Sequence, residues 1–375
     1  MFEQLQNSLA PMFRRLFADD SAPRTVVVVP SLSLDVGELM KLTGVNHYEE
    51  RMLCLLMLLQ LPRTRVVYLT SEPIHPTIID YYLHLLPGIP GRHARERLTL
   101  MNCDDGSMAP LTEKLLARPR LLKRLREVVG DPSAAHITCF NASGLERSLA
   151  VQLGIPLYAC DPNLSLLGTK SLGRELFRDL GVPVPDGFEH LRDESEIIEA
   201  LAALRRRDPT LQRAVVKLND SFSGEGNALF SFEGAPEMGL DAWVKDRIHH
   251  GGLRFEAAHE QWETYLSKYE DMGGIVEAFV EGGDEVRSPS VQCRIDPLGR
   301  VDIVSTHDQV LAGPTGQVYV GCRFPADISY RMEIQEYAGK IATRMASEGV
   351  LGRLAVDFIS VRRGDEWSHY ALEMN

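Results

Sequence analysis

The sequence predicts a parallel α/β region followed by antiparallel α+β structure in the same chain. In the first 165 residues, short continuous apolar runs, such as residues 25–29 and 65–70, alternate with helix-compatible stretches. Continuous hydrophobicity is typical of strands buried on both faces, and their alternation with helices favours a parallel sheet. From residue 274 onward the apolar runs lengthen and come in pairs, which favours antiparallel strands. At about 150 residues per domain, 375 residues suggest two or three domains.

The expected elements are distributed over the whole chain. In the first region we expect strands at 25–29, 65–70, 98–102, 135–141 and 156–159, and helices at 48–60, 76–86 and 111–129. Next we expect a helix at 170–180, which ends before Gly181 and a Val-Pro-Val-Pro segment. A hairpin of strands at 214–218 and 228–232 comes after it. The polar, helical residues 235–272 are interpreted as an insertion. The last region has strands at 275–280, 290–295, 300–306, 317–321, 353–361 and 369–375, and a helix at 328–348.

Composition excludes several classes of protein. The net charge of −12 argues against a nucleic-acid binder or a protein of anionic membranes, because both usually need a basic surface. The longest apolar run, residues 52–61, is half of the ~20 residues that a membrane span requires. The N-terminus lacks the pattern of a secretory signal, and six scattered cysteines without a CxxC pair fit a reducing cytoplasm. The first strand is not followed by G-x-G-x-x-G, and no P-loop motif is present.

The end of the chain carries the most informative candidate site. If residues 353–375 form a hairpin around Asp365, Asp357 lies opposite Glu373, and Asn375 shares the face of Glu373. Opposed carboxylates repel one another unless a positive charge lies between them. Two carboxylates and an amide oxygen are ligands that Mg²⁺ prefers, with water and phosphate oxygens completing its shell. The alternative is that both acids are solvated charges of an edge strand.

A second candidate site surrounds Lys217. This lysine lies in an apolar, β-branched strand, where a charge is costly unless it meets an anion. The small residues that follow let backbone N–H groups approach phosphate oxygens; they are Ser221, Ser223, Gly224 and Gly226. The pattern therefore predicts a phosphate site, with an ordinary hairpin tip as the alternative.

Two further segments have candidate roles. The strand that begins at Gly274 ends in an acidic turn, whose open backbone can bind an adenine edge and whose acids can bind ribose hydroxyls; an ordinary strand end is the alternative. His307 lies at a strand end beside the Gly-Pro-rich turn 313–316, which suggests a role in a substrate site.

Taken in order, these motifs resemble those of the ATP-grasp family of carboxylate–amine ligases. The matching features are a helix with Lys170 before residues 181–185, Lys217 with its loop, the hinge 277–280 with a following acid, and Asp357 with Glu373-x-Asn375. Segments 306–309, 313–317 and 321–325 look most like the peptide ligase of pheganomycin biosynthesis and its relatives.

The resemblance implies an ATP-grasp fold with two α+β lobes that enclose ATP. The implied parts are an N-terminal extension (1–23), a parallel α/β pre-ATP-grasp domain (24–165), a small lobe (166–273) and a large lobe (274–375). It implies a ligase that forms an amide or peptide bond through an acylphosphate. Its partners would be small-molecule or peptide carboxylates and amines, and a homo-oligomer stays open. A catalytically weak nucleotide-binding regulator and a small-molecule kinase are the alternatives.

The resemblance also implies roles for individual residues. Lys170, Lys217 and the loop would hold the phosphates, and two Mg²⁺ ions would bind to Asp357, Glu373 and Asn375. The backbone at Ala278 and Val280, with Glu277, would read adenine, and Glu285 or Asp284 would hold the ribose.

Two departures from the family pattern affect these expectations. Many relatives have arginine two residues before the first metal acid, where this chain has Ala355, so we expect Arg353 or Arg323 to supply that charge. The chain stops at Asn375, where relatives continue, so a C-terminal segment is expected to be missing.

Overall fold

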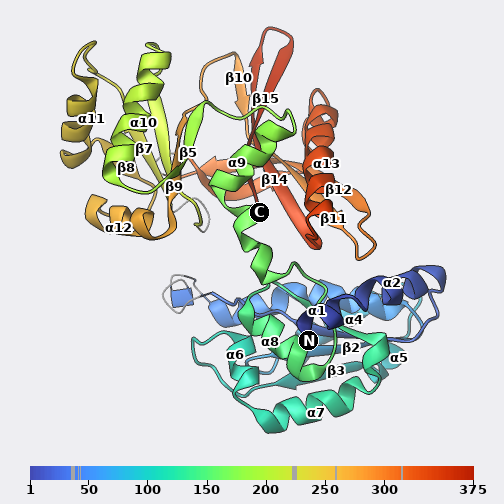
Figure 1. The fold of residues 1–375 in the computed structure, drawn as a ribbon. Helices are drawn as coiled ribbons and strands as arrows, with labels where there is room; N and C mark the ends of the chain where they lie inside the picture. The colour runs from blue at the N-terminus through green and yellow to red at the C-terminus, as the bar shows by residue number, and fades with distance from the viewer. Residues whose placement is uncertain (35–38, 41, 43, 222–225, 258–259, 314–315) are drawn as a thin grey trace. The chain divides into compact units, whose positions relative to one another are not determined.

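A computed structural model describes residues 1–34, 39–40, 42, 44–221, 226–257, 260–313 and 316–375. It divides into two compact units (Figure 1). The first contains residues 1–163 with the short segments 296–300 and 349–352, and the second contains the remainder. Among the described residues, no helix is long and apolar enough to cross a membrane.

The first unit is built on a parallel sheet, as the sequence predicted, but it has four strands where five were expected. The fifth expected strand, 156–159, forms only an isolated bridge between Leu157 and Ile137. Its strands, in the order β3-β2-β1-β4, are β1 (Arg24–Val29), β2 (Thr64–Thr70), β3 (Leu98–Asn102) and β4 (Ala135–Cys139). Its helices are α1 (Phe2–Gln6), α2 (Leu9–Ala18), the 3₁₀ helices η1 (Val45–Gln60) and η2 (Pro132–Ala134), α4 (Pro76–His84), α5 (Gly91–Glu96), α6 (Leu111–Leu116), α7 (Pro119–Val129) and α8 (Gly144–Leu153).

Side chains of β1 explain why the strand is apolar throughout. Val26 and Val28 pack against η1, α4 and α5, whereas Val27 and Val29 pack against α6, α7 and α8 on the opposite face. Because alternate residues of a strand point to opposite faces, a strand that is covered on both sides needs apolar residues at every position.

Two helices of this unit differ from the expectation. The segment expected at 48–60 is a long 3₁₀ helix, in which residues three apart align, and it buries Leu53, Leu56 and Leu59 along one edge. The single helix expected at 111–129 is divided into α6 and α7, because Pro119 cannot donate the hydrogen bond that a continuous helix requires.

The second unit contains two sheets. The five-stranded antiparallel sheet has the order β5-β9-β6-β7-β8 and consists of β5 (Gly187–Leu191), β6 (Arg213–Leu218), β7 (Asn227–Ser231), β8 (Leu253–Phe255) and β9 (Gly274–Ala278). Its helices are η3 (Pro162–Gly168), α9 (Lys170–Asp179), α10 (Glu194–Arg207), α11 (Leu240–His249) and α12 (Trp262–Met272). The boundary expected after residue 273 falls directly before β9, which lies between β5 and β6 in this sheet.

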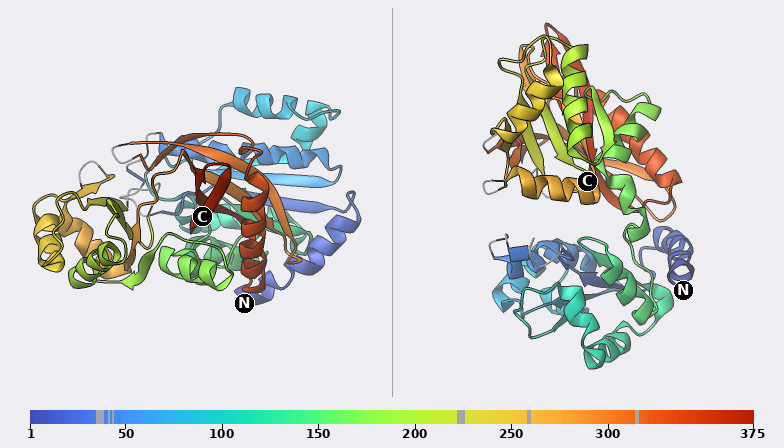
Figure 2. Two further views of the ribbon diagram at one scale, coloured as in Figure 1. Left: turned by 90° about the horizontal axis from the view of Figure 1, so that it is seen from above. Right: turned by 60° about the vertical axis from the view of Figure 1, so that its left-hand side comes forward.

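The six-stranded sheet follows in the sequence. Strands β10 (Glu285–Arg287), β14 (Gly352–Arg363), β11 (Pro289–Ile295), β12 (Val301–Ala312) and β13 (Val318–Arg323) are neighbours in this order, and β15 (Glu366–Met374) pairs with β14. Helix α13 (Arg331–Ser347) packs on β11 and β12 (Figure 2).

Alternation along β6 divides the five-stranded sheet into a core face and a cavity face. Ala214, Val216 and Leu218 join the core with α10, α11 and α12, whereas Val215 and Lys217 line a cavity on the other face. The segment 235–272, expected to be a polar insertion, in fact supplies much of this core, because aromatic residues of α12 are buried in it.

We expect Tyr265→Phe to lower the free energy of unfolding. The buried Tyr265 hydroxyl lies 3.0 Å from Val216 O and 2.9 Å from Gly226 O, so its single proton serves two backbone carbonyls. Removing it leaves buried acceptors without that donor, at a cost of about 1–2 kcal/mol. Urea denaturation would measure the change, and an unchanged midpoint would show that neither bond contributes to stability.

Candidate functional site

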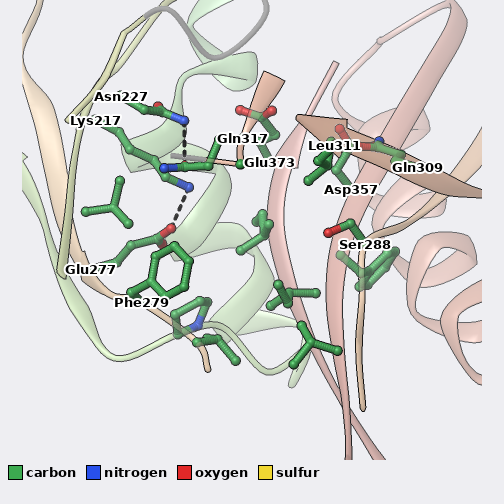
Figure 3. A pocket seen from close by; sticks show the side chains of 18 of the residues that line it. Lys217, Asn227, Glu277, Phe279, Ser288, Gln309, Leu311, Gln317, Asp357 and Glu373 are labelled. Atoms are coloured by element: carbon green, nitrogen blue, oxygen red, sulfur yellow. Dashed lines mark hydrogen bonds and ion pairs between the residues drawn. The ribbon is translucent and has the colours of Figure 1, made fainter. Parts of the chain in front are cut away.

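A cavity of about 810 Å³ lies between the two sheets of the second unit (Figure 3). Lys170, Arg213, Lys217, Glu277 and Glu281 line it from the side of the five-stranded sheet and α9. Arg287, Ser288, Gln309, Asp357, Glu373 and Asn375 line it from the side of the six-stranded sheet. Its volume lies within the range of pockets that hold small-molecule ligands.

The two predicted metal acids are direct neighbours across β14 and β15. The register pairs Asp357 with Glu373, and the Asn375 Nδ2 lies 3.0 Å from Asp357 Oδ2. A β-bulge between Asp357 and Phe358 shifts the register by one residue at this end of the hairpin. Without the bulge, Glu373 would face Val356, so this irregularity brings the carboxylates together.

The charges around this pair affect the two acids differently. Burial, together with the negative charge of Glu373, raises the pKa of Asp357 to about 6, although hydrogen bonds from Ser290, Gln309 and Asn375 act in the opposite direction. Burial also acts to raise the pKa of Glu373, but Lys170 and Lys217 outweigh it and hold that pKa below its usual value. Asp357 is therefore the member of the pair that is harder to ionise.

These residues fit a hard divalent cation. Asp357, Glu373 and Asn375 offer only oxygen donors on the protein side, and the unfavourable proximity of the two acids would be relieved by a cation. The described part of the chain has no group of three or more His, Cys, Asp or Glu side chains that could hold a metal. Solvent and phosphate oxygens would therefore have to complete the shell, as is usual for Mg²⁺ at nucleotide sites.

Two lysines face this carboxylate pair from the other side of the cavity. The Lys170 Nζ lies 3.3 Å from Glu373 Oε2 and 3.2 Å from Ser221 Oγ, and the Lys217 Nζ lies 2.6 Å from Glu277 Oε1. Figure 3 shows Lys217 extending from β6 into the cavity, with Glu373 and Asp357 beyond it. Cations that face a pair of carboxylates able to hold a divalent metal are suited to bind a polyphosphate.

The other end of the cavity is formed by the residues that follow β9. The Arg213 guanidinium lies over the Phe279 ring, 4.1 Å from its centre, and both line the cavity with Ala278 and Val280. The Ala278 N–H donates to Asp186 O at 2.7 Å, so this group is already used within the fold. The Ala278 carbonyl and the Val280 N–H are then the groups to which the adenine prediction applies.

The acid at this end is not the one expected. Glu285 does not line the cavity, and its carboxylate pairs with Arg287 (2.7 Å to Nε) and Arg362. Asp284 also lies outside, where it accepts from the Gly364 N–H at 2.8 Å. Glu281 lines the cavity, with Oε2 2.9 Å from Arg213 Nε, and its buried Oε1 has no partner among the residues that the structure describes.

Two glycines explain this difference. Gly282 and Gly283 have φ values of 84° and 78°, which L-residues rarely adopt, and they turn the chain away from the cavity. Asp284 and Glu285 then lie at the edge of the six-stranded sheet beside β14, outside the cavity, whereas Glu281 lines it.

The remaining predicted residues lie outside the cavity or beyond the described chain. His307 shares a face of β12 with the lining residue Gln309, and its ring lies 5.5 Å from that of Phe324, but it does not line the cavity. Arg323 and Arg353 are exposed and do not line it either. Ser223 and Gly224 lie outside the described residues, whereas Ser221 lines the cavity and Gly226 is buried beside it.

Several lining residues were not predicted. Arg287 is a cavity cation where Arg323 or Arg353 was expected. Asn227 donates to Gln317 Oε1 at 3.0 Å, which connects the two sheets at the cavity (Figure 3). Position 227 is opposite Lys217 in the β6–β7 hairpin, so strand pairing was the signal that could have identified it.

Comparison with known proteins gives a family and two relatives. A family model described as "IQCH-like, ATP-grasp" matches residues 162–254 and 247–369, more than half of the chain. The L-propargylglycine–L-glutamate ligase of Streptantibioticus cattleyicolor is 33% identical over 325 residues, which are 84% of this chain and 64% of that protein. The IQ motif-containing protein H of Danio rerio is 22% identical over 96% of this chain and 37% of its own length. The chain thus spans less than two thirds of either relative.

Solved structures share the fold at low identity. A biotin carboxylase–beta-gamma-ATP complex from Campylobacter jejuni has a TM-score of 0.57 and 14% identity, over 95% of this chain and 65% of that one. The ADP complex of an N5-carboxyaminoimidazole ribonucleotide synthetase has a TM-score of 0.51 and 12% identity, over 94% and 70%. The predicted fold class is thus confirmed.

Proposed function

Because the chain belongs to the ATP-grasp family, we propose that it is an ATP- and magnesium-dependent ligase that joins a carboxylate to an amine. One observation carries the proposal: the Asp357–Glu373 pair faces Lys170 and Lys217 across one end of a cavity of nucleotide size. Phosphoryl transfer depends on positioning and on charge neutralisation, and this arrangement supplies groups for both.

ATP would lie along the cavity, with its phosphates at the end where Lys170 and Lys217 lie. The Ala278 carbonyl and the Val280 N–H would bind the adenine edge, and Glu277 would lie beside it. We assign the ribose hydroxyls to Glu281, because its partly exposed carboxylate lines the cavity at the same end as Phe279 and Val280. Asp357, Glu373 and Asn375 would hold magnesium, with two ions proposed, and the metal would neutralise charge on the phosphates.

The reaction would form a C–N bond in two displacements. A carboxylate oxygen of the first substrate attacks the γ-phosphorus of ATP, the bond to ADP breaks, and an acylphosphate forms. The nitrogen of the second substrate then attacks the acyl carbon, phosphate leaves, and the nitrogen loses a proton. Lys170, Lys217 and Arg287 would hold the transferring group and its charge, which is the main task of a protein in such a reaction.

The substrates are proposed to be amino acids or short peptides. The relative from Streptantibioticus cattleyicolor is named for the joining of L-propargylglycine and L-glutamate. His307 lies on the same face of β12 as Gln309, next to the cavity, where a substrate that approaches the phosphate end would pass.

The test is ADP formation with N-acetylated amino acids as carboxylate substrates and amino acid amides as amine substrates, singly and in pairs. A ligase forms ADP and phosphate together with a condensed product, detectable by mass, only when both a carboxylate and an amine are present. A phosphorylated product without an amine would favour the kinase alternative. Binding of ATP without turnover across the panel would favour a nucleotide-binding regulator.

We expect Glu281→Gln to weaken binding of ATP about 5- to 20-fold and to leave 2′,3′-dideoxy-ATP unaffected. A carboxylate accepts hydrogen bonds from both ribose hydroxyls, and bonds to a charged group are worth about 1.5–3 kcal/mol. Isothermal titration of both nucleotides on both proteins provides the comparison. Equal losses for the two nucleotides would place the ribose elsewhere.

A further inference from the structure

The buried guanidinium of Arg174 has no role in the reaction described above. Arg174 lies one helical turn after Lys170 on α9 and is completely buried. Its Nε donates to Glu189 Oε1 at 2.6 Å, its Nη2 donates to Pro185 O at 2.6 Å, and its Nη1 pairs with Glu277 Oε2. A buried charge is retained only where it is paired and hydrogen-bonded, and Arg174 is both.

The carboxylate of Glu277 is shared between two cations. Its Oε2 binds Arg174, and its Oε1 lies 2.6 Å from the Nζ of Lys217 (Figure 3). Glu277 is only 2% exposed although it lines the cavity, so its charge is compensated mainly by these two cations. Removing the sole partner of a buried charge is strongly unfavourable, because the charge then stays in the interior without compensation.

We propose that Arg174 is the positioning residue that leaves Lys217 available to the phosphates of ATP. If Lys217 were the only partner of Glu277, its ammonium group could turn toward a phosphate only by leaving a buried carboxylate unpaired. Arg174 keeps Glu277 paired in either position of Lys217. The inference rests on the proposed function, and it concerns the charge balance behind the phosphate site rather than a contact with ATP.

The surroundings of Arg174 fix it in this position. Glu189, its second partner, also binds Arg178 at 2.7 Å. A Cβ on Gly187 would lie 2.6 Å from Val276 O and 2.8 Å from Arg174 Nη2, so β5 passes directly against the guanidinium. A planar guanidinium with three separate partners cannot turn toward the cavity without breaking several bonds at once.

The test compares binding of Mg-ATP and of adenosine to the full chain by titration calorimetry. In Arg174→Met, Lys217 becomes the only partner of Glu277, so affinity for Mg-ATP is expected to fall about tenfold or more, while affinity for adenosine changes less than about twofold. Adding Glu277→Gln to Arg174→Met removes the unpaired charge and is expected to restore the affinity of the Glu277→Gln single variant. A purely structural role of Arg174 would give no such rescue.

Arg178→Met is the matched control. This arginine also binds Glu189 one turn further along α9, but it is half exposed and does not contact Glu277, so its removal should leave both affinities unchanged. Arg174→Lys keeps a charge near Glu277 and should retain the preference for ATP over adenosine, which serves as the test if Arg174→Met does not fold.

Three results would overturn the inference. The first is an equal loss of affinity for Mg-ATP and for adenosine in Arg174→Met. The second is that adding Glu277→Gln to Arg174→Met does not restore the affinity for Mg-ATP. The third is a folded Arg174→Lys protein that loses as much affinity for Mg-ATP as is expected of Arg174→Met. Absence of ATP binding by the unmodified protein would instead contradict the proposed function itself, together with this role.

Discussion

Asp357→Asn is expected to abolish magnesium-dependent ATP turnover and, at the same time, to stabilise the metal-free protein at neutral pH. Asparagine keeps the shape of the side chain and one oxygen but loses the negative charge that a divalent cation requires. Metal ions contribute several kcal/mol to phosphoryl transfer, so turnover should fall at least about 100-fold.

The gain in stability follows from the pKa of Asp357. Burial and Glu373 raise that pKa from its usual 3.8 to about 6, so the folded protein binds a proton that the unfolded chain releases. Ionised Asp357 therefore lowers the free energy of unfolding above pH 6, and this penalty disappears as the pH falls through 6 toward 4. Asparagine removes it, which should raise stability at pH 7–8 by about 1–3 kcal/mol.

Both parts of this prediction can be measured on the same protein. Urea denaturation without metal, from pH 4 to pH 8, should give a difference between Asp357→Asn and the unmodified chain that is small near pH 4 and reaches its maximum above pH 6. Using the difference between the two proteins removes the contribution of other titrating groups. A variant that is less stable at pH 8, or that keeps its magnesium-dependent turnover, would contradict the assignment of Asp357 as a buried metal ligand.

The sequence was informative where strand geometry alone decides which side chains are buried and which lie opposite each other. Helices cover both faces of the parallel sheet, so its strands need apolar side chains on both faces. Residues 26–29 are apolar throughout, and this continuous hydrophobicity allowed the parallel sheet to be predicted. The opposition of Asp357 and Glu373 was also predicted. That prediction assumed a regular hairpin, whereas the structure reaches the same pairing through a bulge that local sequence does not reveal.

The sequence was less informative where long-range contacts decide which of several similar residues lies at the cavity. Four acids lie in the segment 277–285, and the resemblance to the family favoured Glu285, or Asp284, for the ribose. The backbone at Gly282 and Gly283 instead leaves Glu281 at the cavity. Arg174 likewise resembles a surface residue of a helix, and only the packing of α9 against β5 and β9 shows that it is buried.

Residues 235–272 were expected to form a polar insertion, but part of this segment is buried in the core. The segment is rich in charged residues, and it was therefore interpreted as an insertion although it also carries aromatic side chains. Trp262, Tyr265 and Tyr269 nevertheless lie on one face of α12, at intervals of three and four residues, and complete the core on the face of the five-stranded sheet opposite the cavity. Apolar residues repeated at helical spacing therefore predict burial better than the overall polarity of the segment does.

Lys217→Met is expected to lower affinity for Mg-ATP about 10- to 100-fold without a comparable effect on adenosine. The methionine side chain approximates the stem of lysine but cannot neutralise phosphate charge, and a hydrogen-bonded ion pair in a buried site is worth about 1.5–3 kcal/mol. The variant should stay folded, because Glu277 keeps Arg174 as its partner. Titration with ATP, AMP and adenosine should show a loss that grows with the number of phosphates.

The matched control for this variant is Lys340→Met. Lys340 is exposed on α13, where it pairs with Glu336 at 2.8 Å, so its removal changes the net charge equally and should leave ATP binding unchanged. If Lys217→Met bound ATP normally, the phosphates could not lie at this end of the cavity. The carboxylate pair would then need another explanation, because a metal site beside Glu373 is useful to the proposed reaction only when phosphate oxygens complete it. Binding of ATP to this variant thus tests the phosphate site and the metal site together.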